Sequence, residues 1–282
     1  MKLETLTRGV DIRAAVRAAQ RGGQKVGFVP TMGALHEGHL SLVDAARAEC
    51  HRVAASIYVN PSQFGPGEDF ARYPRPLERD LALLRERGCD LAFVPEAAEM
   101  YPPGFDSWVE VGRVAEPLEG VARPGHFRGV ATVVLKLFQL VPADRAYFGR
   151  KDYQQTLVVK QMAADLNVPV DVRVLPIIRE ADGLAMSSRN AYLSPAERKQ
   201  AVSLWQSLEL AKRAQAAGET DADRIRQQML AHIAQAGGVE VEYIAFLRDG
   251  TMDESPQIAG PTVVALAARV GRTRLIDNHT IG

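Results

Sequence analysis

The sequence predicts an α/β protein in which a Rossmann-like, mainly parallel sheet precedes a smaller C-terminal α+β domain. Up to about residue 175, short apolar runs alternate with segments that carry apolar residues at three- and four-residue spacing, as in strand–helix–strand units. After residue 176 the pattern changes to two long helices followed by three strand-like runs. We therefore expect two domains, residues 1–175 and 176–282, within the 282-residue chain.

The strands expected in the first domain are short and mostly apolar. Near-continuous apolarity indicates strands that are covered on both faces, as in parallel sheets. A further run, SWVEVGRV at 107–114, predicts an additional strand in an insertion. The five main strands are expected at KVGFVP (25–30), RVAASIYVN (52–60), DLAFVP (90–95), RAYFG (145–149) and VPVDVRVL (168–175).

Helical spacing fills the intervals between these strands. The segment at 60–76 interrupts the alternation, because it holds four prolines and two glycines. Loops of this length in compact domains are often functional. The helices of the first domain are expected at 38–50, 76–88, 128–141 and 153–166.

The C-terminal domain begins with a strong helix start signal. Ser194 is the expected N-cap, Pro195 occupies the first helical position, and Glu197 completes a capping box. A second helix is expected to end at the glycines 237–238. Three strand-like runs, 239–249, 261–271 and 273–278, then predict a small antiparallel sheet.

Composition excludes several classes of protein. Lys plus Arg and Asp plus Glu each number 34, so the net charge of zero gives no general attraction for nucleic acid or an acidic membrane. No apolar stretch of about 18 residues predicts a membrane span, and we expect no signal or transit peptide, because the first 20 residues hold acids and no continuous apolar run. Two cysteines, Cys50 and Cys89, make neither a disulfide scaffold nor a metal cluster. We expect buried thiols in a cytoplasmic protein.

The segment FVPTMGALHEGHLSL, 28–42, joins a strand to a helix through glycines and two histidines. Gly33 and Gly38 have phosphate-loop spacing, but His39 and Leu40 replace the required Lys and Ser or Thr. The spacing in HEGH is also wrong for a zinc helix, and no third ligand is evident. Structural histidines are the remaining alternative. Two imidazoles beside glycines at a helix N-terminus favour an anion site, because unpaired N–H groups and the helix dipole attract negative charge.

The His-x-Gly-His pattern resembles the signature of the adenylyl-transferring superfamily that includes class I aminoacyl-tRNA synthetases. The longer blocks PTMGALHEGHLSL, YVNPSQF, YPR, FGRKDYQQ and ADGLAMSSRNAYLS resemble, in order, those of the pantoate–β-alanine ligase family. This resemblance implies ATP-dependent condensation of (R)-pantoate with β-alanine to pantothenate through a pantoyl adenylate, with release of AMP and pyrophosphate. It also implies Mg²⁺, a homodimer, substrate sites in the first domain and a second domain that acts as a lid.

The resemblance assigns roles to individual residues. His36, His39, Lys151, Ser187, Ser188 and Arg189 are the expected catalytic residues. Arg150 lies within an ATP segment but receives no role of its own, because the family usually has another residue there. The expected ATP-binding residues are Met32, Gly33, Ala34, Leu35, His36, Glu37, Gly38, His39, Gly149, Arg150, Lys151, Asp152, Ile178, Met186, Ser187, Ser188 and Arg189; those expected to bind substrate are Gln63, Gln155, Asn60, Val133, Val134 and Leu137.

Several assignments have plainer alternatives. The segment 150–155 also reads as a solvated helix start, 186–190 as a polar turn, and the valines at 133–134 as helix core. Arg123, His126 and Arg128 either steer an anion or form a solvated basic turn. Protein ligands of magnesium stay open, because Arg79 occupies one candidate position and Asp80 the next. Two other functions fit the superfamily: a nucleotidyltransferase that stops after nucleotide transfer, and a nucleotide-binding protein without catalysis.

Overall fold

The computed structural model describes residues 3–282, which fall into two compact units. The first comprises the chain up to residue 150 together with 154–176, and the second comprises 151–153 together with 177–282. Each unit has a sheet and a core of its own. The lid role of the second unit stays a prediction.

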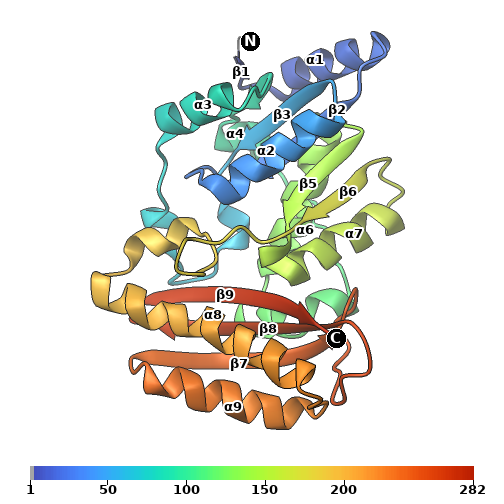
Figure 1. Cartoon of the computed structure of the whole chain (residues 1–282). Helices are drawn as coiled ribbons and strands as arrows, with labels where there is room; N and C mark the ends of the chain where they lie inside the picture. Colours follow the sequence, from blue (N-terminus) through green and yellow to red (C-terminus); the bar gives the residue numbers. More distant parts are fainter. Residues whose placement is uncertain (1–2) are drawn as a thin grey trace. The chain divides into compact units, whose positions relative to one another are not determined.

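A six-stranded parallel sheet forms the centre of the first unit (Figure 1). Its strand order is β1-β4-β3-β2-β5-β6, so the chain reverses direction across the sheet between β2 and β5. Ligands of open α/β sheets bind beyond the carboxyl ends of the strands at such a switch point. The strands are β1 (Glu4–Leu6), β2 (Val26–Thr31), β3 (Arg52–Ile57), β4 (Leu91–Phe93), β5 (Arg145–Gly149) and β6 (Asp171–Leu175).

Helices cover both faces of this sheet, as its apolar strands require. Helices α1 (Gly9–Arg21), α6 (His126–Leu140) and α7 (Tyr153–Asp165) contribute to the core on one face. Helices α2 (Glu37–Glu49) and α3 (Leu77–Glu86) contribute to the core on the other. Two single-turn helices, α4 (Ala97–Met100) and α5 (Glu119–Ala122), lie between β4 and α6.

The parallel sheet and its helices confirm the predicted fold class, but one predicted strand is wrong. Residues 107–112 form no strand, and a short 3-10 turn, η3, follows at Arg113–Ala115. The Val109 N–H donates to the hydroxyl of Thr132 on α6, at 3.0 Å, rather than to a neighbouring strand. Alternating residues alone do not make a strand, because the backbone also needs a sheet edge to pair with. Conversely, the structure contains β1 and α1, which were not predicted from the sequence.

The second unit is a three-stranded antiparallel sheet with two helices packed along it (Figure 1). The strands are β7 (Val239–Arg248), β8 (Thr262–Val270) and β9 (Thr273–Ile281), and the helices are α8 (Pro195–Ala216) and α9 (Ala222–Gln235). The predicted helix start is confirmed: the Ser194 hydroxyl accepts from the Glu197 N–H, and the Glu197 carboxylate accepts from the Ser194 N–H.

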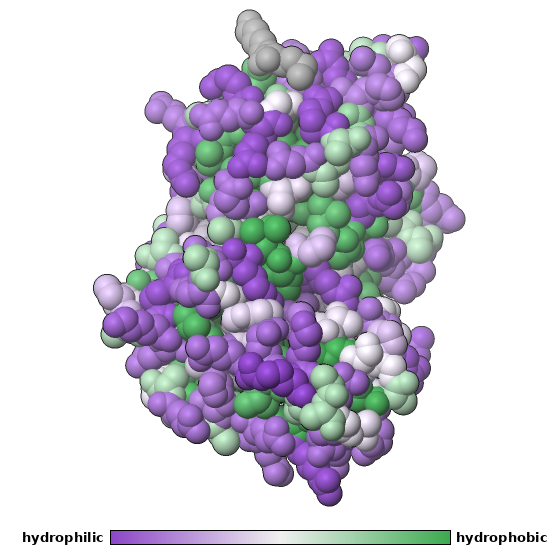
Figure 2. All heavy atoms as spheres, in the orientation of Figure 1, coloured by the Kyte–Doolittle hydropathy of each residue, from purple (hydrophilic) through white to green (hydrophobic). Residues whose placement is uncertain are grey.

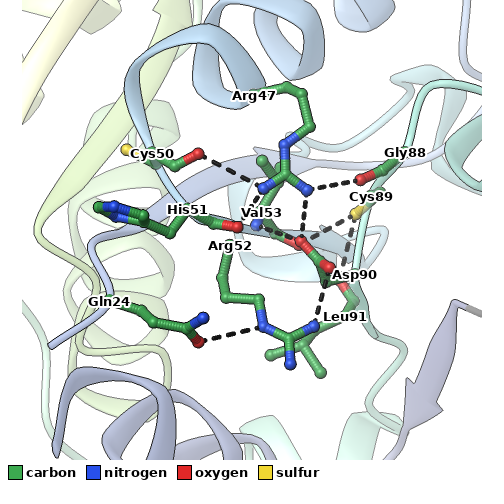
Figure 3. Close-up of polar contacts among 10 residues, drawn as sticks. All are labelled: Gln24, Arg47, Cys50, His51, Arg52, Val53, Gly88, Cys89, Asp90 and Leu91. Carbon is green, nitrogen blue, oxygen red and sulfur yellow. Dashed lines mark hydrogen bonds and ion pairs between the residues drawn. The ribbon is translucent and has the colours of Figure 1, made fainter. Parts of the chain in front are cut away.

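A buried carboxylate joins the amino ends of β3 and β4 in the first unit (Figure 3). Asp90, only 3% exposed, accepts hydrogen bonds from Arg47 at 2.8 Å, from Arg52 at 2.9 Å and from the Val53 N–H at 2.8 Å. Two guanidinium groups therefore compensate its charge, as a buried ion requires. This cluster ties α2 to two strands at the edge of the sheet opposite the switch-point loops.

The state of the two cysteines agrees with the sequence analysis. Cys50 and Cys89 are free and buried, as predicted. Hydrophilic residues dominate the face drawn in Figure 2. Within residues 3–282, no helix is both long enough and apolar enough to cross a membrane.

Candidate active site

The loop after β2 leaves the sheet through a tight left-handed turn. Gly33 and Ala34 have φ angles of 82° and 49°, a region that only glycine adopts without strain. The Thr31 hydroxyl helps to close the turn, because it accepts from the Gly33 N–H at 3.1 Å and donates to the Ser56 carbonyl at 2.6 Å. A Cβ atom on Gly33 would lie 3.0 Å from the carboxylate of Asp80. The turn therefore brings the backbone close to that carboxylate.

Asp80 on α3 holds this turn by its backbone. Its two oxygens accept from the N–H groups of Ala34 and Leu35, at 2.8 and 2.9 Å, and the residue is only 1% exposed. Burial raises the pKa of the Asp80 carboxyl, and the two N–H bonds oppose that rise. The glycine turn predicts that its backbone N–H groups approach an anion. For these two groups the anion is a carboxylate of the chain itself.

The two histidines of the loop form a reciprocal cap at the start of α2. His36 is the N-cap: its Nδ1 accepts from the Gly38 N–H at 3.1 Å, and Nδ1 of His39 accepts from the His36 N–H at 3.4 Å. The ring centroids lie 4.1 Å apart. A neutral imidazole that accepts at Nδ1 carries its proton on Nε2. The cap therefore makes Nε2 of each ring a hydrogen-bond donor.

The segment after β5 carries the second group of predicted ATP residues. β5 ends at Gly149, and 150–152 form a 3-10 turn that leads into α7. The Lys151 ammonium lies 3.7 Å from the Asp152 carboxylate. Of the next two glutamines, Gln154 is buried and its amide binds the backbone of Val114, Pro117 and Glu119. Gln155 is only partly buried, so it is the one of the pair suited to bind a ligand.

Gln63, expected to bind substrate, lies in a hydrogen-bonded network at the end of the short turn η1 (Pro61–Gln63). Its amide oxygen accepts from Asn60 Nδ2 at 3.1 Å, and its amide nitrogen lies 3.1 Å from the sulfur of Met32. Asn60 is buried and also donates to the Gly129 carbonyl and accepts from Tyr101. The amide of Asn60 is thus used to orient Gln63.

Residues that the sequence analysis did not connect with Gln63 hold its backbone. The Gln63 carbonyl accepts from His126 Nδ1 at 2.9 Å and from Arg123 at 3.3 Å, and Arg123 forms a bidentate pair with Glu68. Burial, followed by the Arg123 charge, lowers the pKa of His126 to about 4. Neither residue belongs to a solvated basic turn, and only Arg128 of the predicted group is exposed.

Helix α6 packs unusually closely against this turn. A Cβ atom on Gly129 would lie 2.3 Å from the Ser62 carbonyl oxygen, so no larger residue fits without displacing η1. A glycine within an apolar helical pattern was the available sequence signal, since glycine disfavours helix. Val133, Val134 and Leu137 follow on α6 and are buried in the core of the first unit.

A cavity of ≈320 Å³ lies beside Met32 and Gly33. Its walls are mostly apolar and come from the end of β3 and the residues after it, the long loop, α3 and the segment that follows β4, and neither Gln63 nor Gln155 lines it. We therefore assign it no substrate.

The remaining predicted ATP residues lie in the second unit, on a hairpin and the turn after it. Arg179 and Ala185 pair as an antiparallel bridge, and the Met186 N–H donates to the Ile178 carbonyl at 3.0 Å. Ser187 caps the next turn, η5 (Ser188–Tyr192), by accepting from the Arg189 N–H at 3.2 Å. The predicted polar turn is therefore present, and the Ser187 hydroxyl proton stays able to donate.

Comparison with known proteins identifies the family. The family model described as pantoate-beta-alanine ligase matches residues 4–280. The chain belongs to the pantoate–β-alanine ligase family. It is accordingly a carbon–nitrogen bond-forming ligase of the family that makes pantothenate. The resemblance that the motif blocks indicate is confirmed, and the match extends beyond those blocks to residues 4–280.

Individual relatives agree with this assignment. Pantothenate synthetase from Herpetosiphon aurantiacus is 56% identical over 264 residues, which cover 93% of this chain and 96% of the relative. A crystal structure of pantothenate synthetase from Thermus thermophilus has a TM-score of 0.93 at 46% identity and covers 98% of both chains. The pantoate–β-alanine ligase of Francisella tularensis, complexed with beta-gamma ATP and β-alanine, has a TM-score of 0.83 at 32% identity, over 99% of this chain and 97% of that one.

Proposed function

We propose that the chain condenses (R)-pantoate with β-alanine in two steps, through a pantoyl adenylate, and releases AMP and pyrophosphate. One observation carries the proposal: the reciprocal cap at the start of α2 makes Nε2 of both His36 and His39 a donor. That cap follows β2, a strand at the switch point of the sheet. The related Francisella ligase, whose structure holds an ATP species and β-alanine, supports the same substrates here.

In the first step a pantoate carboxylate oxygen bonds to the α-phosphorus of ATP, and the bond from that phosphorus to the pyrophosphate oxygen breaks. Negative charge builds on the phosphate oxygens as this occurs. The imidazole donors of His36 and His39, the N-terminus of α2 and the Lys151 ammonium are the groups that we assign to this charge. These groups need only be positioned donors, so no proton transfer from either histidine is required.

In the second step the β-alanine amine attacks the acyl carbon of the adenylate. A carbon–nitrogen bond forms, the bond from the acyl carbon to AMP breaks, and the amine loses a proton to water or buffer. AMP is a far better leaving group than the oxide of a free carboxylate, so ATP makes the acyl transfer possible. Exclusion of water protects the adenylate from hydrolysis.

Gln63 and Gln155 are the residues that we assign to pantoate. The Gln63 amide donates to a carboxylate and accepts from a hydroxyl, which suits a small hydroxy acid. Its side chain is fixed by Asn60 and its backbone by His126 and Arg123. Val133, Val134 and Leu137 would supply apolar contact for the gem-dimethyl group, in addition to their place in the core.

Magnesium is expected to enter as the complex with ATP rather than to occupy a site built by the protein. Both Asp80 oxygens accept backbone N–H bonds, and Asp80 is buried. Across residues 3–282, no group of three or more His, Cys, Asp or Glu side chains is arranged to hold a metal ion. Magnesium retains several waters and binds phosphate oxygens readily, so it needs few protein ligands.

Pyrophosphate release, measured with ATP and pantoate in the presence and absence of β-alanine, tests the proposal. With β-alanine, AMP, pyrophosphate and pantothenate should accumulate in equal amounts. Without β-alanine, the enzyme should release only about one molecule of pyrophosphate per active site, because the adenylate stays bound. Production of ADP would refute the mechanism.

The same assay separates the other two functions. A nucleotidyltransferase would turn over fully without β-alanine, and a binding protein would release no pyrophosphate. The implied homodimer is a separate proposal, which sedimentation at several concentrations would test; a single monomeric species throughout would refute it.

A further inference from the structure

Strand β9 carries two adjacent buried polar residues for which the predicted reaction has no role. Asp277 and Asn278 are 4% and 2% exposed. They end the run TRLIDN, which the sequence identified only as a strand. Buried charges and amides are costly unless they are paired, so their partners indicate what they do.

Asp277 holds Arg179 with both carboxylate oxygens, at 2.6 and 3.0 Å. The same guanidinium donates to the carbonyls of Gly183 and Asn278, at 3.1 and 3.2 Å, and lies 3.7 Å over the ring of Trp205. A bidentate pair with both partners largely buried fixes position and orientation together.

Arg179 belongs to the hairpin that carries two of the residues assigned to ATP, Ile178 and Met186. It lies next to Ile178 and pairs with Ala185, which precedes Met186. The turn η5, which contains Ser188 and Arg189, follows directly. Fixing the Arg179 side chain therefore fixes the backbone that presents these groups.

Asn278 holds a different part of the chain. Its Nδ2 donates to the Lys151 carbonyl at 3.0 Å, and its own N–H donates to Asp277 at 2.7 Å. Lys151 belongs to the same compact unit, together with Tyr153, whose hydroxyl accepts from the Gly250 N–H at 2.8 Å. Two adjacent residues of β9 thus contact two segments that lie far apart in the sequence.

We propose that Asp277 and Asn278 are positioning residues for ATP: Asp277 acts through Arg179 on the hairpin with Ile178, and Asn278 acts on the backbone of Lys151. This inference rests on the proposed function, since that function assigns both segments to ATP. It explains why position 278 is an amide. An amide donates to the Lys151 carbonyl, whereas a carboxylate would repel that carbonyl and neutralise the lysine.

Charge around the pair fits this role. Burial raises the pKa of Asp277, and its hydrogen bonds and ion pair with Arg179, followed by the Lys151 charge, lower it. Arg179 is the direct ionic partner of Asp277, so the Lys151 ammonium is not needed to neutralise that carboxylate. Its charge can act on phosphate instead.

The test compares KM for ATP with KM for pantoate in pyrophosphate release, using wild type, Asn278→Ala and Arg179→Lys. Asn278→Ala removes the hydrogen bond to the Lys151 carbonyl and keeps the contacts of the Arg179 hairpin. Arg179→Lys removes hydrogen bonds of that hairpin and keeps the bond to Lys151. Loss of a buried bond to a positioned group corresponds to about a tenfold rise in KM for ATP. KM for pantoate should stay within about twofold, since none of these contacts involves the residues assigned to pantoate.

Arg274→Gln is the matched control. Arg274 lies near the start of β9, and the substitution breaks its ion pair with Glu242 on β7. It should leave both constants unchanged. The inference would be overturned if KM for ATP were unchanged in the folded variants, or if KM for ATP and KM for pantoate rose by the same factor. If Asn278→Ala does not fold, Arg179→Lys decides, since it keeps the charge that Asp277 requires. Wild type without ATP-dependent pyrophosphate release would instead refute the proposed function.

Discussion

Two buried aspartates of the first unit, Asp80 and Asp90, are held in contrasting ways. Asp90, at the amino ends of β3 and β4, pairs with two arginines and one backbone N–H. Asp80, beside the loop that leaves the carboxyl end of β2, accepts two backbone N–H groups. Burial raises the pKa of Asp80, against the smaller opposing effects of these two N–H bonds and of the Arg79 charge.

The difference indicates that Asp90 mainly stabilises the fold, whereas Asp80 mainly positions a loop of the candidate active site. An ion pair with two arginines adds charged contacts between a helix and two strands. A carboxylate that holds backbone N–H groups fixes the course of a loop and leaves nearby cationic side chains available to other anions. We therefore expect substitutions at the amino edge to affect unfolding, and substitutions at the carboxyl edge to affect turnover.

The largest effect should come from the carboxyl edge. His39→Ala removes one donor from the phosphate oxygens and should lower kcat by about 10²–10³. Its midpoint of thermal unfolding should stay close to that of wild type, because the lost cap contact is long, at 3.4 Å. Steady-state pyrophosphate release and calorimetry measure the two quantities. A near-normal kcat would contradict the assigned role.

The amino edge should behave in the opposite way. Asp90→Asn leaves Arg47 and Arg52 without a carboxylate, so the free energy of unfolding should fall by roughly 2–3 kcal/mol. This is below the cost for fully buried pairs, because Arg52 is 46% exposed. Urea unfolding measures the loss, and kcat at 25 °C should be unchanged. A large loss of kcat in folded protein would break the distinction between the two edges.

His126 extends the comparison to a buried base. Its pKa is lowered from 6.5 to about 4, first by burial and then by Arg123, against the opposing effects of the Gln63 carbonyl, Glu119 and Glu68. The folded protein therefore favours the neutral ring. Its contribution to stability is present above pH 6.5 and is lost as pH falls toward 4. Between pH 6.5 and 5 the loss should be about 1.6 kcal/mol.

His126→Gln should remove this pH dependence, as measured by urea unfolding at several pH values. His51→Gln, at an exposed position, is the control and should keep it. Identical slopes for wild type and His126→Gln between pH 6.5 and 5 would show that His126 is not buried in its neutral form.

The smallest effect should come from Asp80→Asn. The amide replaces one acceptor by an N–H donor that faces a backbone N–H, which should displace the turn at Ala34 and Leu35. We expect KM for ATP to rise about tenfold, equivalent to about 1.4 kcal/mol. The change in unfolding free energy should be smaller than for Asp90→Asn, since Asp80 is buried without a pair of arginines and burial raises its pKa. Glu78→Gln, on the exposed side of α3, is the control.

Local pattern predicted most of the elements. The helix start at Ser194 was readable because a capping box needs only residues three positions apart. The alternation of strands and helices gave the parallel sheet for a similar reason. The run 107–112 failed as a strand because pairing depends on a partner far away in sequence, and three-residue β1 was too short to give a periodic signal.

The sequence by itself determined the fold class, the helix cap at Ser194 and the chemical types gathered in the motifs at 28–42 and 149–155, because these depend on neighbouring residues and on spacing. Only the tertiary structure decided that Asp80 holds the turn after β2, that His126 and Arg123 hold Gln63, and that β9 holds Lys151 and Arg179. Each of these contacts joins segments at least 45 residues apart. Hydrogen bonds of this kind depend on where the packed elements place donors and acceptors, which local propensity does not specify.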